Sequence, residues 1–176
     1  MNNRKPMFLG EFAHAVDSKG RVAVPTQFRR ILPIEANTRL VLVRGADDCI
    51  EAHTVDGWAE HFELKMEGLP LYDVQSLRIR RSRLASAREV EIDGQGRVLI
   101  PKNLRDMSGI VDSAVVLGVG PLFEIWEPAR YQRYLQAAET HYREDLNLLD
   151  AGSKTTGKES AHGSSGSSVP RPGDGA

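Results

Sequence analysis

The sequence predicts an α+β fold that is mostly β, with short helices and a disordered tail at its C-terminal end. Three observations predict it. A thirteen-residue motif occurs twice. Short segments of alternating apolar residues surround each copy and end at turn-forming residues. The last 26 residues lack the apolar side chains that a core needs.

The repeat consists of residues 17–29, DSKGRVAVPTQFR, and residues 93–105, DGQGRVLIPKNLR, which align without gaps at an offset of 76. Further along, Ile50-Glu51 corresponds to Phe123-Glu124, and Trp58 corresponds to Tyr131. A match of this length indicates that one small structural unit occurs twice in the chain.

The boundaries of the units follow from the repeat. We expect the first copy over residues 7–67, with its core at about 11–58, and the second over residues 87–147, with its core at about 87–130. Residues 68–88 are expected to form an Arg-rich linker helix. Residues 151–176 form the tail, in which 12 of 26 residues are Gly or Ser.

In the first copy, a strand is predicted over Phe8, Phe12, His14 and Val16, because these residues alternate with others along the chain. Asp17 to Gly20 suits a type I turn, since an aspartate accepts a backbone N–H two residues on and glycine tolerates positive φ. The elements expected next are a strand at 21–24 and a short helix from Pro25, with Phe28, Ile31 and Leu32 on the apolar face of the helix. A hairpin of 40–44 and 49–53 should follow, and then a helix over 56–66 with an apolar stripe of Ala59, Phe62 and Met66.

The second copy repeats this order. Asp93 and Gly96 are its turn-forming residues, and Asp73 is expected to cap the linker helix, which runs to about Arg88. The other elements expected are strands at 89–92, 97–100, 115–119 and 123–127, a helix from Pro101, and a helix from Pro128 with Tyr131, Tyr134, Leu135, Ala138 and Tyr142 on its apolar face.

The composition is that of an ordinary soluble protein, with 40% hydrophobic and 27% charged residues and a net charge of −1. Any binding of nucleic acid therefore needs a local basic surface or repeated copies in an oligomer. Cys49 is the single cysteine, so no intrachain disulfide can form, and we expect it in the core. The N-terminal MNNRKP is not a secretory signal, and no apolar run approaches the ~20 residues of a spanning helix, so the cytoplasm is expected.

The two Asp-x-x-Gly-Arg loops, 17–21 and 93–97, are the main candidate site. Turn chemistry explains their Asp and Gly but not their Arg. Two explanations are open: Arg pairs with Asp across the turn and holds the hairpin, or Lys19 and Arg21 project from the tip toward an anion. A planar guanidinium suits a phosphate or a guanine edge. Arg97 corresponds to Arg21, and Gln95 stands where the first loop has Lys19.

A second basic segment runs from Arg78 to Arg83. On a helix, Arg78, Arg81 and Arg88 lie near one side, which would suit a DNA-facing surface. A solvated or interfacial helix face is the alternative that such charge runs favour. The sequence contains no nucleophile elbow, P-loop or dinucleotide-binding motif, and its five histidines lack metal-ligand spacing. We therefore expect no catalytic residue, no metal, no cofactor and no small-molecule substrate.

The ordered motifs resemble those of the MraZ family. The resemblance is carried by Met7-Phe8-Leu9-Gly10, by Asp17 to Arg21 with Val24-Pro25, by Arg78, Arg81 and Ala87, by Asp93 to Arg97 with Ile100-Pro101, and by Phe123 to Trp126. It covers roughly residues 7–145. The six residues before Met7 include Arg4 and Lys5, which either add a basic arm or precede a true start at Met7.

This resemblance implies tandem AbrB-like swapped-hairpin units, so that one chain mimics a dimer of simpler AbrB-type proteins. It implies a ring-shaped homo-oligomer in the cytoplasm, associated with the nucleoid. The function implied is a transcriptional regulator, usually a repressor, at the promoter of the division and cell-wall gene cluster that includes its own gene. The target would be double-stranded DNA with short tandem G-rich repeats, contacted by Lys19 and Arg21, less by Arg97, with Arg78 and Arg81 as further candidates.

Two other functions remain open. The first is a protein-binding module similar to the antitoxin-like relatives of AbrB, which would bind a partner protein instead of DNA. The second is an enzyme that uses the Asp and Arg of the loops on a phosphorylated substrate. The absence of a nucleophile–base pair in the sequence disfavours the enzyme.

Overall fold

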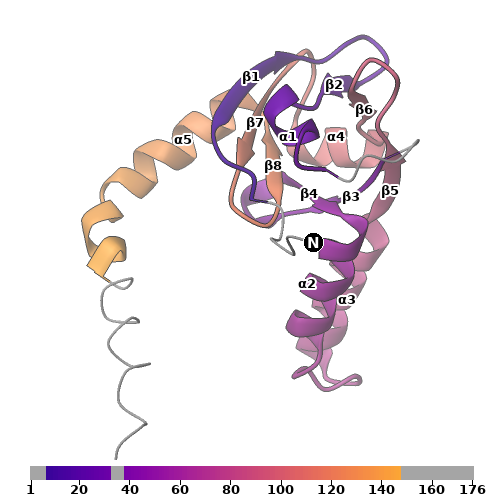
Figure 1. The fold of residues 1–176 in the computed structure, drawn as a ribbon. Helices are drawn as coiled ribbons and strands as arrows, with labels where there is room; N and C mark the ends of the chain where they lie inside the picture. The colour runs from indigo at the N-terminus through magenta and orange to yellow at the C-terminus, as the bar shows by residue number, and fades with distance from the viewer. Residues whose placement is uncertain (1–6, 33–37, 148–176) are drawn as a thin grey trace, which may run out of the picture. The chain divides into compact units, whose positions relative to one another are not determined.

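The computed structural model describes residues 7–32 and 38–147 (Figure 1). The predicted tail and the basic residues Arg4 and Lys5 lie outside these ranges. The elements in chain order are β1 (Glu11–Ala15), β2 (Arg21–Ala23), α1 (Thr26–Arg29), β3 (Arg39–Arg44), the 3₁₀ turn η1 (Ala46–Asp48), β4 (Ile50–Thr54), α2 (Val55–Met66), α3 (Val74–Ser86), β5 (Arg88–Glu91), β6 (Arg97–Leu99), α4 (Lys102–Ser108), β7 (Ser113–Gly118), β8 (Phe123–Trp126) and α5 (Pro128–Glu139).

The chain divides into two units, residues 1–134 and residues 135–176. The first unit contains every strand and the candidate site, and it is the subject of the following paragraphs. The described part of the second unit, residues 135–147, is largely helical.

The two copies of the repeat share both antiparallel sheets of the first unit. The larger sheet has the strand order β1-β7-β8-β4-β3-β5, and the smaller is a two-stranded ribbon of β2 and β6. Except in the hairpins β3–β4 and β7–β8, every pairing joins a strand of one copy to a strand of the other. The repeat makes β1 equivalent to β5, β3 to β7 and β4 to β8. If the equivalent strands exchange places, the strand order of the larger sheet is the same order read in reverse. This confirms the α+β fold of two intertwined, pseudo-symmetric repeats.

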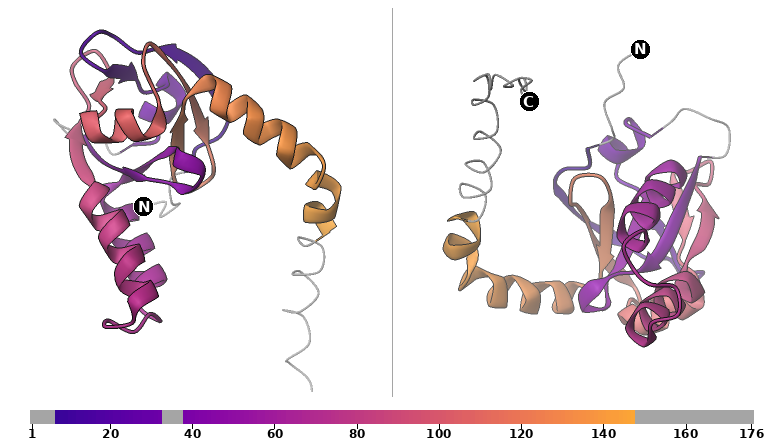
Figure 2. Two further views of the ribbon diagram at one scale, coloured as in Figure 1. Left: turned by 180° about the vertical axis from the view of Figure 1, so that it is seen from behind. Right: turned by 90° about the horizontal axis from the view of Figure 1, so that it is seen from below.

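The main hydrophobic core lies between the larger sheet and the ribbon, with α1 and α4 beside it, whereas α2 and α3 extend away from the ribbon (Figures 1 and 2). Side chains that are at most 1% exposed come from the ribbon (Val22, Val98), the short helices (Phe28, Leu104) and the sheet (Leu40, Leu42, Ile50, Phe123, Ile125). Because both copies contribute to this core, removal of either copy would expose the apolar face of the other.

Several local predictions are confirmed. Asp73 is the N-cap of α3, and its Oδ2 accepts a hydrogen bond from the backbone N–H of Ser76 at 2.9 Å. Cys49 is buried. The prolines Pro25 and Pro101 directly precede α1 and α4, where the fixed φ of proline is compatible with a helix start. Among the described residues, no helix is both long and apolar enough to cross a membrane.

Three predicted helix faces are wrong in part. On the face predicted for the helix from Pro128, Tyr131 is buried, but Tyr134 is 45% and Leu135 37% exposed. Ile31 is 40% exposed, because α1 ends at Arg29 after a single turn and no longer directs residue 31 toward the core. In α2, Ala59 is exposed, and the aromatic rings of Trp58 and Phe62 pack together instead, with centroids 5.7 Å apart. The side chain of Met66 lies outside those that the structure describes.

The linker helix is shorter than predicted. It ends at Ser86, and Arg88 is the first residue of β5, which pairs with β3. Arg88 therefore does not share a helix face with Arg78 and Arg81. Strand pairing with a distant segment overrides the local helical pattern here.

Candidate nucleic-acid interface

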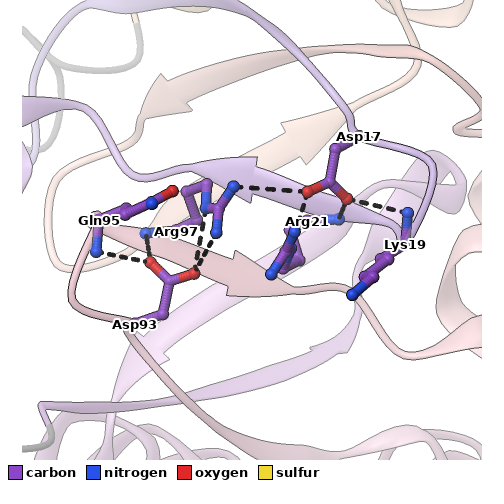
Figure 3. Close-up of polar contacts among 6 residues, drawn as sticks. All are labelled: Asp17, Lys19, Arg21, Asp93, Gln95 and Arg97. Atoms are coloured by element: carbon purple, nitrogen blue, oxygen red, sulfur yellow. Dashed lines mark hydrogen bonds and ion pairs between the residues drawn. The ribbon is translucent and has the colours of Figure 1, made fainter.

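The first Asp-x-x-Gly-Arg loop is a turn built around Asp17 (Figure 3). The N–H of Gly20 donates to the carbonyl of Asp17 at 2.8 Å, and the Asp17 carboxylate accepts backbone N–H groups of Lys19 and Arg21, both at 3.0 Å. Gly20 has φ +84°, in the left-handed region that favours glycine. These contacts confirm the predicted turn.

The second loop has the same backbone arrangement. The N–H of Gly96 donates to the carbonyl of Asp93 at 2.8 Å, and the Asp93 carboxylate accepts the N–H groups of Gln95 at 3.0 Å and Arg97 at 2.9 Å. Gly96 has φ +77°. The turn therefore does not depend on whether position three is Lys or Gln.

Both loop arginines fold back onto their own aspartates. Arg21 donates from Nε to Asp17 Oδ2 at 2.7 Å, and Arg97 donates from Nε and Nη2 to Asp93 Oδ2 at 3.0 and 2.9 Å. The side chains of Arg21 and Arg97 are 31% and 26% exposed. Of the two explanations for the arginine, pairing across the turn is the geometry that the chain adopts. A guanidinium has five donors, so this pairing leaves others for a ligand.

Arg97 also connects the two loops. Its Nη1 lies 3.5 Å from Asp17 Oδ2, so the side chain stands between both aspartates (Figure 3). Asp17 thus faces two arginines, whereas Asp93 faces one. The two loops are held in a fixed relation by side chains as well as by the ribbon.

The ribbon presents one polar face. Arg21 is paired with Leu99, and Ala23 with Arg97, while Val22 and Val98 point into the core. Because side chains alternate along a strand, the two arginines share the outer face with Leu99, which is 51% exposed. The sequence did not identify Leu99 as a surface residue.

The aspartates remain ionised at neutral pH. The backbone hydrogen bond from Arg21 is the largest cause that lowers the pKa of Asp17, to about 2, and the corresponding bond from Arg97 lowers the pKa of Asp93. Their charges oppose those of the loop arginines. Lys19 is exposed and forms no ion pair with any residue that the structure describes.

Each loop glycine is covered by an arginine from the other copy. A Cβ built on Gly20 would lie 2.5–2.6 Å from Cζ, Nε and Nη1 of Arg105, and one built on Gly96 would lie 2.6–2.8 Å from the same atoms of Arg29. The glycine carbonyls also accept backbone bonds from the other copy, from Ile100 N to Gly20 O at 3.0 Å and from Val24 N to Gly96 O at 2.9 Å. The repeat showed that Arg29 and Arg105 are equivalent, but not where they lie.

The other predicted arginines lie elsewhere. Arg78 and Arg81 are exposed on α3, a helix that extends away from the ribbon (Figures 1 and 2). Their neighbour Arg83 binds Glu51, with Nη2 to Oε2 at 2.5 Å and Nη1 to Oε1 at 3.1 Å. The structure does not bring the arginines of α3 to the loops.

Histidine and cysteine side chains offer no alternative site in the described ranges. His53 is buried, and its Nε2 lies 2.9 Å from Glu51 Oε2, within the network that includes Arg83. No group of three or more His, Cys, Asp or Glu side chains is placed to hold a metal ion among the residues described.

The intertwined strands and the two equivalent loops define a chain of two β-rich repeats that share both sheets. A family model described as "MraZ protein, putative antitoxin-like" matches residues 7–71 and 84–148, and the chain therefore belongs to the MraZ family. Three similar proteins are each named "Transcriptional regulator MraZ". That of Treponema denticola is 35% identical over 80% of this chain and 95% of its own length. Those of Acetivibrio thermocellus and Natranaerobius thermophilus are 38% and 39% identical, over 73% and 77% of this chain and 86% and 92% of theirs.

Proposed function

We propose that this protein is a DNA-binding transcriptional regulator that contacts double-stranded DNA with the outer face of the ribbon β2–β6 and the loops at its ends. The observation that carries the proposal is the placement of both loops and both loop arginines on one two-stranded ribbon. The major groove of B-DNA admits such a ribbon. The names of the relatives support regulation of transcription as the purpose of the contact.

The proposed contacts differ between the loops. Lys19 meets phosphate as an exposed, unopposed charge. Arg21 uses only Nε on Asp17, which leaves its terminal nitrogens for a bidentate contact with guanine O6 and N7. Arg97 uses Nε and Nη2 on Asp93 and places Nη1 near Asp17, so it contributes less to the contact with DNA.

The regulator is proposed to act as a ring-shaped homo-oligomer on the nucleoid. Its targets are short tandem G-rich repeats in the promoter of the division and cell-wall gene cluster that includes its own gene, where it acts mainly as a repressor. One ribbon spans only a few base pairs, but linked subunits can raise avidity by about 10²–10⁴. An oligomer presents several copies of the same local basic surface to DNA. It can therefore bind DNA although each chain has a net charge of −1.

The proposal is tested with three duplexes: one repeat, several repeats in phase, and several repeats separated by half-turn insertions. In an electrophoretic shift, we expect the in-phase array to bind much more tightly than the other two, because repeats spaced by about 10–10.5 base pairs present the same groove face. Equal binding of one repeat and the array would contradict multivalent recognition. No binding to the protein's own upstream DNA would contradict the function itself.

A protein-binding module is the second candidate. It is favoured by the exposed apolar side chains near the turn between α2 and α3, which are Leu71, Tyr72 and Val74. If the protein binds a partner encoded beside its gene and fails to shift its upstream DNA, this second function is the correct one.

A further inference from the structure

We propose that Arg29 and Arg105 are two further DNA-contacting residues, each completing the loop of the opposite copy. Arg105, from α4, completes the loop that carries Lys19, and Arg29, from α1, completes the loop that carries Gln95. This inference rests on the proposed function and specifies which residues form its phosphate-binding surface.

The first support is the position of the guanidinium groups. Three atoms of the Arg105 guanidinium would be almost equidistant, at 2.5–2.6 Å, from a Cβ on Gly20. The group therefore packs against the backbone of the loop at Gly20. Arg29 covers Gly96 in the same way, with distances of 2.6–2.8 Å. The absence of a side chain on both glycines is what makes room for the arginines.

The second support is the charge that remains at each loop. Arg21 and Arg97 are opposed by Asp17 and Asp93. Among the described residues, Arg29 bonds only neutral groups, from Nε to the carbonyl of Val24 at 3.2 Å and from Nη2 to Thr26 Oγ1 at 3.0 Å. No carboxylate in the described ranges therefore pairs with its positive charge.

Among the described residues, the guanidinium of Arg105 has fewer hydrogen-bond partners than that of Arg29. Its Nε is buried without a hydrogen-bond partner, and within the described ranges its guanidinium forms no ion pair. The residue equivalent to Thr26 is Lys102, whose Nζ binds Asp106 at 2.6 Å instead of supporting Arg105. An exposed edge of such a guanidinium is suited to a phosphate oxygen.

With these arginines, the positive charge at the two loops is more similar than the loop sequences alone indicate. The second loop lacks a lysine, but Arg29 brings an unopposed charge to it from the first copy. The first loop has Lys19 and receives Arg105 from the second copy. Both arginines belong to helices and not to the ribbon that would enter the groove, so we expect them to bind phosphates and not base edges.

The experiment measures the salt dependence of binding to a duplex of the protein's own upstream DNA. Arg29→Met and Arg105→Met keep the aliphatic stem and remove the charge. Each is expected to lower the slope of log K against log salt by about 0.9 per engaged subunit, and the double variant by about twice that amount, since every phosphate contact releases counterions. Arg29→Lys and Arg105→Lys should restore the slope.

Arg133→Met is the matched control, because Arg133 is an exposed arginine on α5. It should leave the slope unchanged, and all variants should keep the wild-type melting temperature and oligomer size. Wild-type slopes in both Met variants would overturn the inference while leaving DNA binding intact. A lowered melting temperature that the Lys variants do not correct would also overturn it, since the arginines would then act only in folding. If the wild-type protein does not bind, the proposed function fails first.

Discussion

The first and second Asp-x-x-Gly-Arg loops have the same backbone but different surroundings. Both turns are closed by an aspartate that accepts two backbone N–H groups. In the first loop, the side chain of Arg21 donates one hydrogen bond to Asp17, and an exposed lysine precedes the glycine. In the second, Arg97 donates twice and reaches across to Asp17. The comparison shows that a duplicated turn can keep its backbone geometry while the side chains of the two copies take different partners.

The largest expected effect that sharpens this comparison comes from Arg21→Ala. A bidentate contact between arginine and guanine contributes about 1–3 kcal/mol, and the proposed ring would lose it in every engaged subunit, so specific DNA binding should be abolished. Arg97→Ala should cost less, because more of its donors are already used. Affinity is measured on the upstream duplex, with oligomer size by chromatography as the control. Equal losses of DNA affinity in Arg21→Ala and Arg97→Ala would contradict the proposed difference between the two loops.

The second effect concerns the glycines of the turns. Gly20→Ala should destabilise the fold by about 1–3 kcal/mol, because φ is positive and the new Cβ meets Arg105. Gly94 is the matched control, since a Cβ added there would meet no atom within 4 Å beyond its chain neighbours, and Gly94→Ala should change the melting temperature little. Equal destabilisation by both would show that the contact with Arg105 and the backbone angle are unimportant.

The third effect is a response to acid. The pKa of Asp17 is held at about 2, below its ordinary value of 3.8, so ionised Asp17 stabilises the folded loop. This stabilisation is fully present above about pH 4 and is lost as the pH falls toward 2. Carboxyl chemical shifts followed by NMR should therefore place the titration of Asp17 near 2. Titration near 3.8 would contradict the hydrogen bonds that close the turn.

The smallest effect is the coupling between the loops. Asp17 and Arg97 are 3.5 Å apart and partly exposed, so solvent screens their attraction. A double-mutant cycle of Asp17→Asn and Arg97→Met should give a small favourable coupling in melting temperature. The same cycle with Asp93 in place of Asp17 should give a larger one, because that pair is bonded twice. The reverse order would show that Arg97 belongs mainly to the first loop.

The local structure of the site follows from residue types that are close together in the chain. The repeat predicts two copies, and the residue types at Asp17, Gly20, Asp93 and Gly96 predict the turns without knowledge of any long-range contact. These features depend on groups no more than four residues apart, such as Asp17 and Arg21. The Asp73 cap is equally local. The motifs were also sufficient to indicate the family.

The pairing of the strands, and the loop that each arginine contacts, depend on contacts between distant segments of the folded chain. The pairing of β2 with β6, the approach of Arg97 to Asp17 and the placement of Arg105 on Gly20 all join segments about 80 residues apart. The exposure of Leu99 and the inclusion of Arg88 in a strand depend on the same pairing of distant segments. A periodic sequence pattern specifies which face of an element is apolar, but the partner of that face is chosen by the shared core, because only the folded chain brings the two copies together.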